Sequence, residues 1–226
     1  MRKIQRLAGI GVMAAATLAL AACGGTAAPA SSPAASAPAA APATAAPAAT
    51  DTGVTTNADV FGPACSQLPQ GDAPGSLNNM GPQPVATAAS TNPLLTTLVT
   101  AVKAVPGLPD TLNNTQGITV FAPYNGAFDA VQKQIGAPAF QGLLKDTNKL
   151  GGLLSYHVVG QRYDAKGLVA AGETTELAGG NLTIGGTADA PTITDGQGNT
   201  AKVLCGNIPT SNATVFVIDR VLMPKS

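Results

Sequence analysis

Residues 119–128, with the sequence T-V-F-A-P-Y-N-G-A-F, constrain the fold of this chain more than any other stretch. Side chains alternate between the two faces of a strand, so Val120 and Ala122 share one face while Phe121 lies on the other. Apolar groups on both faces indicate a strand that is buried on both sides. Pro123 has no backbone N–H to donate and is expected to end the strand.

A helix is predicted directly after this strand. Asn125 is a good N-cap, because its side-chain oxygen can accept a hydrogen bond from a backbone N–H of the first turn. Phe128, Val131 and Ile135 fall on one face at helical spacing. The stretch therefore predicts a buried strand that turns sharply into a packed helix.

The first 22 residues have the composition of a secretory signal peptide. Cations at Arg2, Lys3 and Arg6 precede an alanine-rich apolar run, 7–22, that is shorter than the roughly 20 residues that span a bilayer. The run ends in L-A-A-C-G, which resembles the bacterial lipobox, and that resemblance implies cleavage before Cys23 and a diacylglycerol on its sulfur. Two or three acyl chains hold a protein on a membrane. The alternatives are an ordinary signal peptide with a chance cysteine and an uncleaved anchor.

The remaining chain divides into three parts by composition. Residues 23–56 are rich in Ala, Pro, Ser and Thr without hydrophobic periodicity, which predicts an extended tether. Residues 57–83 form a Gly- and Pro-rich lead-in that is expected to be ordered but irregular, and the irregular structure is expected to continue to residue 90. The folded domain is assigned to residues 84–226.

Within that domain, helical patterns come first and short strands follow. This order predicts an α+β fold. The last strand has apolar side chains on both faces, so we expect it to be central and to lie beside strand 119–123. Helices are predicted at 93–105, 125–135, 138–144 and 148–154, a turn at 164–169, and strands at 119–123, 156–159, 174–177, 181–184, 191–194, 201–205 and 214–223.

Three blocks of the domain resemble the fasciclin (FAS1) family in order and spacing. They are residues 119–128, the pair Tyr156-His157, and residues 215–224 with the sequence V-F-V-I-D-R-V-L-M-P. Tyr124 and Gly126 depart from the family pattern, which often has threonine and a larger residue there. With the lead-in and its cysteine, the chain resembles the mycobacterial group of fasciclin surface lipoproteins and secreted antigens.

The resemblance implies a single domain of wedge-shaped β-sheets with helices packed on one side, and a role in adhesion without catalysis. In that family the tyrosine-histidine motif has been tied both to domain integrity and to cell binding. Tyr156 and His157 are therefore the candidate binding residues, and their burial would favour the structural role.

The cysteine count predicts one disulfide. With Cys23 assigned to the lipobox, Cys65 and Cys205 are an even pair in an exported protein. The alternative is that both remain free thiols.

The sequence offers no catalytic residues, no metal site and no cofactor site. His157 is the only histidine, which is too few for a histidine-based zinc site, and no G-x-S-x-G nucleophile motif occurs. We therefore expect no enzyme. The chain has no Lys/Arg cluster to bind a phosphate backbone, so nucleic acid is not an expected partner. The paired carboxylates outside the tether are predicted to be solvated loop charges: Glu173 with Glu176, and Asp189 with Asp195.

The chain is thus expected to be a bacterial surface lipoprotein, anchored by lipid on the extracytoplasmic face of the cell membrane. It would act as an adhesion or interaction module toward a protein or glycan of the matrix or cell wall. In a host-associated organism its lipidated end would be a ligand for host lipoprotein-sensing receptors. The alternative is an envelope lipoprotein that binds a small ligand or polysaccharide, which a deep apolar pocket with converging polar groups would favour. An enzyme of unknown type is a third reading without supporting residues.

Overall fold

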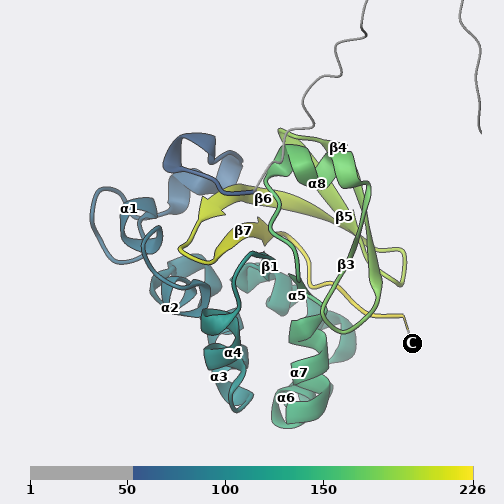
Figure 1. The fold of residues 1–226 in the computed structure, drawn as a ribbon. Helices are drawn as coiled ribbons and strands as arrows, with labels where there is room; N and C mark the ends of the chain where they lie inside the picture. The colour runs from purple at the N-terminus through teal and green to yellow at the C-terminus, as the bar shows by residue number, and fades with distance from the viewer. Residues whose placement is uncertain (1–52, 226) are drawn as a thin grey trace, which may run out of the picture. The chain divides into compact units, whose positions relative to one another are not determined.

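The computed structural model describes residues 53–225, and these form a seven-stranded sheet with helices packed mainly on one side (Figure 1). The predicted signal peptide, Cys23 and the tether up to residue 52 lie outside the described residues. The strands are β1 Ile118–Pro123, β2 Val158–Val159, β3 Glu173–Thr175, β4 Asn181–Thr187, β5 Ala190–Thr194, β6 Thr200–Pro209 and β7 Ala213–Ile218.

The helices fall into an early group before β1, a group between β1 and β2, and α8 after β2. The α-helices are α1 Leu77–Met80, α2 Val85–Thr91, α3 Thr96–Ala104, α4 Leu108–Asn114, α5 Asn125–Ile135, α6 Ala137–Lys145, α7 Thr147–Ser155 and α8 Ala165–Ala171. Three short 3-10 helices complete the described part: η1 Asn57–Asp59, η2 Pro63–Gln67 and η3 Pro93–Leu95. The predicted α+β fold is confirmed.

The sheet has the order β2-β1-β7-β6-β5-β4-β3, and only β1 and β7 pair in parallel. The predicted central position of the last strand, beside 119–123, is therefore confirmed. An isolated antiparallel bridge between Val159 and Glu176 joins the two outer ends of the sheet. The backbone N–H of Leu177 also donates to the carbonyl of Val158 at 2.8 Å. The sheet consequently curls almost into a barrel.

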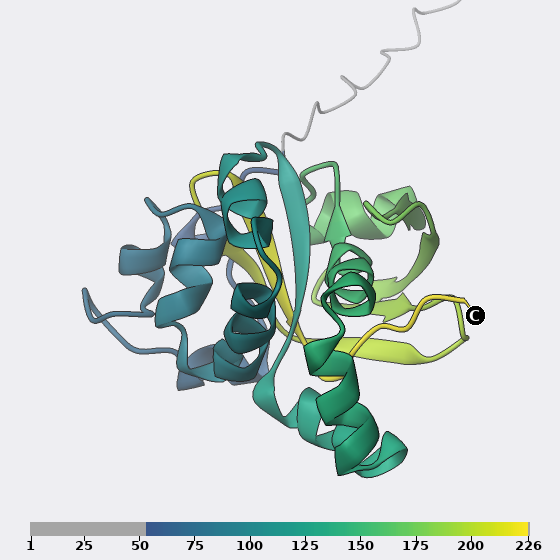
Figure 2. The same ribbon diagram turned by 90° about the horizontal axis from the view of Figure 1, so that it is seen from below.

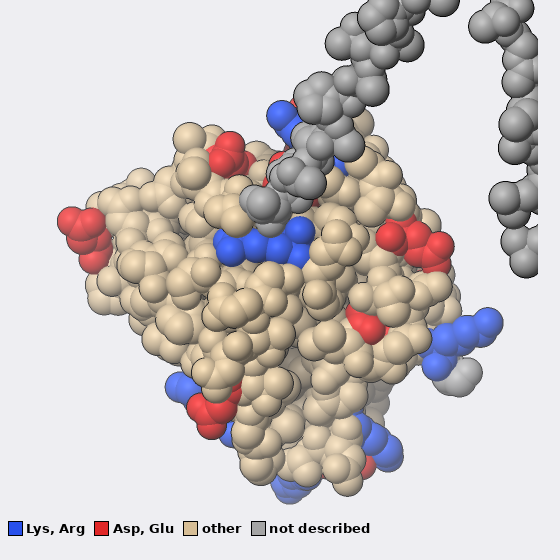
Figure 3. Space-filling model, in the orientation of Figure 1, with Lys and Arg blue, Asp and Glu red and all other residues tan. Residues whose placement is uncertain are grey.

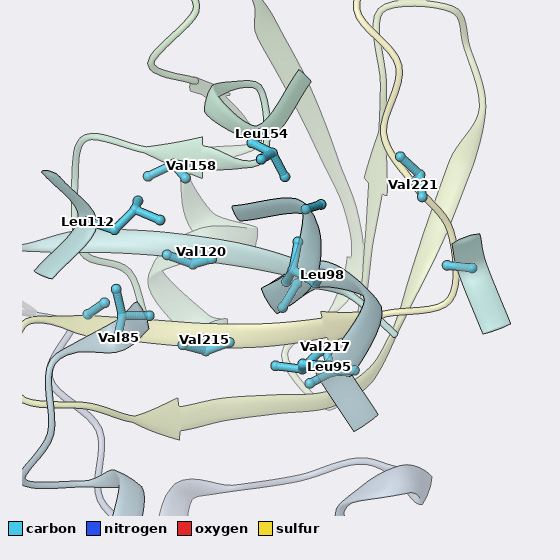
Figure 4. Close-up of a cluster of buried hydrophobic side chains, with 14 of the residues drawn as sticks. Val85, Leu95, Leu98, Leu112, Val120, Leu154, Val158, Val215, Val217 and Val221 are labelled. Atoms are coloured by element: carbon cyan, nitrogen blue, oxygen red, sulfur yellow. The ribbon is translucent and has the colours of Figure 1, made fainter. Parts of the chain in front are cut away.

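Two hydrophobic cores lie on the two faces of the central strands. The helix-side core takes Val120 of β1 and Val215 and Val217 of β7, and packs them against helices α2 to α7 (Figure 4). The inner core takes Phe121 and Phe216, whose ring centroids are 6.0 Å apart, and packs them with α8 and strands β4 to β6. In Figure 2 the blue and teal helices of 77–114 lie on one side of β1 and the green segments of 165–199 lie on the other. The predicted burial of both faces is confirmed.

The disulfide between Cys65 and Cys205 is present, with a Cα–Cα distance of 5.0 Å. It joins η2 of the lead-in to β6, and the neighbouring Phe61 forms an isolated bridge with Gly206. A Cβ atom at Gly206 would lie 2.4 Å from the Phe61 ring, so any larger residue here would displace that ring. The lead-in was predicted to be ordered but irregular; it is ordered, but it contains the short helices η1, η2 and α1. Covalent and backbone contacts hold it to the sheet.

Asn125 does not cap its own helix, in contrast to the prediction. Tyr124 is the N-cap of α5, and the Asn125 side chain turns to α3 instead. Its Oδ1 accepts from the backbone N–H of Thr97 and from the hydroxyl of Thr96, both at 3.0 Å, and its Nδ2 donates to the carbonyl of Pro93 at 3.0 Å. Asn125 thus caps a helix that begins 29 residues earlier. Ile135 is also mispredicted, since it is 41% exposed at the end of α5.

Three seven-residue helices were not predicted: α2, α4 and α8. The caps of α2 come from far along the chain, because its first N–H groups donate to Oδ1 of Asn212 at 2.9 Å and Oδ1 of Asn113 at 2.9 Å. Asp164 caps α8, where a turn was expected. The last strand ends at Ile218 rather than 223, and the strand predicted at 156–159 is reduced to its last two residues.

Replacing Asn125 by alanine should lower the free energy of unfolding by about 1–2 kcal/mol, because α3 loses its cap and Pro93 loses a donor. The control is Asn114→Ala, which truncates an exposed asparagine at the end of α4 and should change stability by less than about 0.5 kcal/mol. Urea unfolding of both variants measures the difference. Equal losses in the two would contradict the assigned role of Asn125.

Candidate functional site

His157 lies inside the domain, between α7 and β2, with 3% of its surface exposed. Its Nε2 accepts from the backbone N–H of Leu222 at 2.9 Å, and its Nδ1 lies 2.7 Å from the carbonyl oxygen of Leu153. Since a backbone N–H can only donate and a carbonyl can only accept, the ring proton is on Nδ1. Burial lowers the pKa of His157 to about 4, against the raising effects of the Leu153 carbonyl and Asp195. The imidazole is therefore neutral, and both of its nitrogens are hydrogen-bonded to the backbone.

Tyr156 is also buried, with 2% of its surface exposed. Its hydroxyl oxygen accepts from the backbone N–H of Gly196 at 2.8 Å, and burial raises the pKa of this phenol. Its ring meets that of His157 edge-on. The two candidate binding residues are thus adjacent, but their polar atoms face the interior. Their burial favours the structural role over direct contact with a partner.

Two carboxylates that were predicted to be solvated are buried. Asp195 is 5% exposed and accepts from the backbone N–H groups of Gln197 at 3.0 Å and Asn199 at 2.8 Å. Glu176 is 3% exposed and accepts from the backbone N–H groups of Ala178 and Gly180. The prediction is wrong for both, because these carboxylates organise turns by accepting backbone hydrogen bonds that the local sequence does not reveal.

The segment after β7, residues 219–225, is held by these buried polar groups. Leu222 N–H donates to His157, and Met223 N–H donates to Oδ2 of Asp195 at 2.9 Å. The Gln197 side chain adds a bond to the carbonyl of Pro224 at 3.2 Å. The tyrosine-histidine motif and the turn at Asp195 therefore fix the position of this C-terminal segment.

A cleft of about 440 Å³ lies beside that segment, and we call it the C-terminal cleft. Its apolar floor includes Val131 of α5 and Val221, and its rim carries Gln134, Asp219 and Arg220. Sequence analysis missed this site, because its parts come from three separate segments, within 127–135, 197–199 and 219–223, that the fold brings together. The full lining is Ala127, Ala130, Val131, Gln134, Ile135, Gln197, Asn199, Asp219, Arg220, Val221 and Met223.

An apolar cavity of about 60 Å³ lies between α2, α3, α4 and the edge of the sheet at β1 and β2. Apart from Lys103 and His157 its lining is apolar. An engineered apolar cavity that binds benzene is roughly 150 Å³. This cavity is smaller and has no converging polar groups, so it does not support the small-ligand alternative.

The described residues contain no candidate metal site, and the face shown in Figure 3 carries no large charged patch. No three His, Cys, Asp or Glu side chains within residues 53–225 are placed to hold a metal ion. On the face shown in Figure 3, basic and acidic side chains stand in small groups separated by uncharged surface. In the same part of the chain no single helix is long and apolar enough to cross a membrane. The segments 85–91 (α2) and 93–104 (η3 with α3) reach that length and hydropathy only when counted together, and they meet at a bend of 99°.

The stability of the domain should fall as the pH decreases from about 6.5 to about 4. The pKa of His157 is lowered from 6.5 to about 4, so in this window the unfolded chain takes up a proton that the folded domain refuses. The contribution of neutral His157 to the free energy of unfolding is fully present above pH 6.5, and up to about 3 kcal/mol is lost by pH 4. Urea unfolding at several pH values measures this loss.

The matched variant for this experiment is His157→Gln, which removes the only histidine while leaving every carboxylate in place. It should be less stable at neutral pH but should lose less stability between pH 6.5 and 4. The same pH dependence in variant and wild type would show that His157 is not the titrating group.

Comparisons with known proteins agree with the fold and the motifs. The family model described as the fasciclin domain matches residues 93–224. The chain is 41% identical over 175 residues to the cell surface glycolipoprotein MPB83 of Mycobacterium bovis and to MPT83 of Mycobacterium tuberculosis, covering 74% of this chain and 73% of each relative. It is 37% identical over 177 residues to the immunogenic protein MPB70 of Mycobacterium bovis, covering 74% of this chain and 83% of that protein.

Among solved structures, the FAS1 domain pair of the insect cell adhesion molecule fasciclin I aligns with a TM-score of 0.54 and 18% identity. The alignment covers 62% of this chain and 51% of that chain, about half of the domain pair. At this identity it shows the fold alone. The family match and the mycobacterial relatives together show that the chain belongs to the fasciclin domain family.

Proposed function

We propose that this chain is a membrane-anchored bacterial surface lipoprotein that presents one fasciclin domain as an adhesion module. The observation that carries the proposal is the 41% identity to mycobacterial proteins named cell surface glycolipoproteins. The lipobox-like L-A-A-C-G at 20–24 adds a site for the anchor, with Cys23 as the lipidated residue. In a host-associated organism, the lipidated end would also be a ligand for host lipoprotein-sensing receptors.

The described end of the tether suits this role. Residues 53–56, which the sequence assigns to the tether, begin on the domain itself, where the Thr214 hydroxyl donates to the carbonyl of Gly53 at 2.6 Å. Arg162 braces the same place by donating to Thr214 Oγ1 at 3.0 Å and to the Ala213 carbonyl at 2.8 Å. The chain therefore enters at the first residues of the central strand β7.

The C-terminal cleft lies past the other end of the same strand, because Asp219 and Arg220 follow its last residue, Ile218. Five residue steps from Thr214 to Asp219 at about 3.3 Å each separate the two ends by roughly 17 Å. A domain tethered at one end of its central strand can present the other end to a partner.

The proposal includes no catalysis. Within residues 53–225 the buried titratable groups already have backbone partners: His157 bonds Leu153 and Leu222, and Asp195 and Glu176 accept from turns. A general base needs a free lone pair within reach of a substrate proton. All three groups are buried, so none of them lies within reach of a substrate proton at the surface.

Replacing Cys23 by alanine should release the chain from the membrane when it is expressed in a bacterium with lipoprotein-processing enzymes. Wild-type chain should sediment with membranes and partition into detergent, since acyl chains supply the anchor. Its processing should be blocked by globomycin, and intact mass should show the added lipid. Equal membrane retention of Cys23→Ala and wild type would contradict a lipid anchor at this residue.

The full-length lipidated chain in liposomes should bind immobilised cell-wall glycan or matrix protein in a saturable manner, whereas empty liposomes should not. Surface plasmon resonance over both kinds of surface measures this. Absence of binding to every surface would contradict the adhesive function. A small metabolite that raised the melting temperature of the same preparation would then favour the small-ligand alternative.

A further inference from the structure

The C-terminal cleft contains hydrogen-bonding atoms that the fold leaves without partners. Asp219 accepts from the Lys202 N–H with Oδ1 at 2.8 Å, which leaves Oδ2 available. The Arg220 guanidinium and the Gln134 amide form no hydrogen bond or ion pair within the described residues, and both residues are exposed. Asn199 uses its Nδ2 on Asp195 at 3.2 Å, so its Oδ1 remains an acceptor. The rim therefore offers both donors and acceptors.

The floor of the cleft is apolar. Val131 and Val221 are buried, while Met223 is partly buried and Ile135 is 41% exposed. These side chains give aliphatic contact area between the polar groups of the cleft, which come from α5, from the β5–β6 turn and from residues 219–220. A ligand seated there would be contacted by C–H groups below and by planar polar groups at its edges.

The charges of the rim favour a neutral ligand. Asp219 and Arg220 bring one negative and one positive side chain, and the other polar lining residues are the neutral amides Gln134, Gln197 and Asn199. A strongly anionic ligand would be attracted by Arg220 but repelled by the neighbouring Asp219, and the reverse would hold for a cationic ligand. A ligand with many hydroxyl groups satisfies both kinds of rim atom, because each hydroxyl donates and accepts.

We propose that the C-terminal cleft is a binding site for a neutral glycan, whose hydroxyls bond Gln134, Asp219 and Arg220 while its ring C–H groups rest on Val221 and Met223. The volume of about 440 Å³ lies within the range of ordinary ligand sites, and it accommodates a short segment of a polysaccharide. This inference rests on the proposed adhesive function and names the partner class for it.

The cleft lies at the end of the domain that is far from the tether. It is lined by a helix, a hairpin turn and the segment after β7, all at the end of the sheet away from Gly53. The His157 and Asp195 bonds fix the backbone of 222–223, so the floor is preformed in the described domain. Preorganisation of this kind lowers the entropy that binding costs.

The test uses the full-length lipidated chain in liposomes on an array of short linear oligosaccharides of glucose, mannose and galactose, with uronic acid and sulfated oligosaccharides as anionic arms. We expect binding to at least one neutral oligosaccharide. The double variant Gln134→Ala/Arg220→Ala should bind it at least about tenfold more weakly, because two rim groups are lost.

The matched control is Gln141→Ala/Lys145→Ala, which removes an exposed glutamine and an exposed cation from α6, outside the cleft, and should bind like the wild type. Both variants should keep the wild-type melting temperature, since all four side chains are exposed. Equal weakening in the two variants, or none in the cleft variant, would overturn the inference while leaving the adhesive function in place. Binding to anionic oligosaccharides alone, or to matrix protein alone, would do the same. Absence of binding to any glycan or protein surface would overturn the proposed function itself.

Discussion

The parallel pairing of β1 with β7 is the interaction on which the rest of the domain depends. Six consecutive residue pairs, from Ile118 opposite Ala213 to Pro123 opposite Ile218, are buried without exception. One face of this pair supports the helix-side core and the other supports the inner core. This is the longest pairing between two strands that are buried at every residue, and both cores pack against it, so its loss would expose both cores at once.

Much of this arrangement can be predicted from the sequence, because its physical causes are local. Strands buried on both faces show apolar residues at consecutive positions, as Val120, Phe121 and Ala122 do, and this pattern predicts a central place in the sheet. The disulfide follows from a cysteine count in an exported chain. Helix α7 follows from the spacing of its leucines. Residues 119–128, the tyrosine-histidine motif and residues 215–224 identify the family.

The parts that were missed depend on groups distant in sequence. Helix α2 begins where Asn212 and Asn113 supply its cap, and no residue near Val85 indicates this. The carboxylate of Asp195 follows a strand and precedes a glycine, which is the pattern of a solvated turn, yet the turn folds inward and Met223 donates to it. The cleft likewise combines α5, the β5–β6 turn and the C-terminal segment. Periodicity and turn rules describe one segment at a time, so they cannot place such contacts.

The family motif at 215–224 contains both buried core residues and surface residues, and the chain passes from one to the other at the end of β7. Val217 and Ile218 are fully buried, and each fits a fixed place between the cores. The strand ends there, and Asp219 and Arg220 emerge at the rim of the cleft, before Val221 and Leu222 turn back inside. A buried substitution in this motif removes apolar contacts and unfolds the domain before it tests recognition. A substitution at the two charged residues leaves both cores intact. Within this motif, therefore, only substitutions of Asp219 and Arg220 can test binding without unfolding the domain.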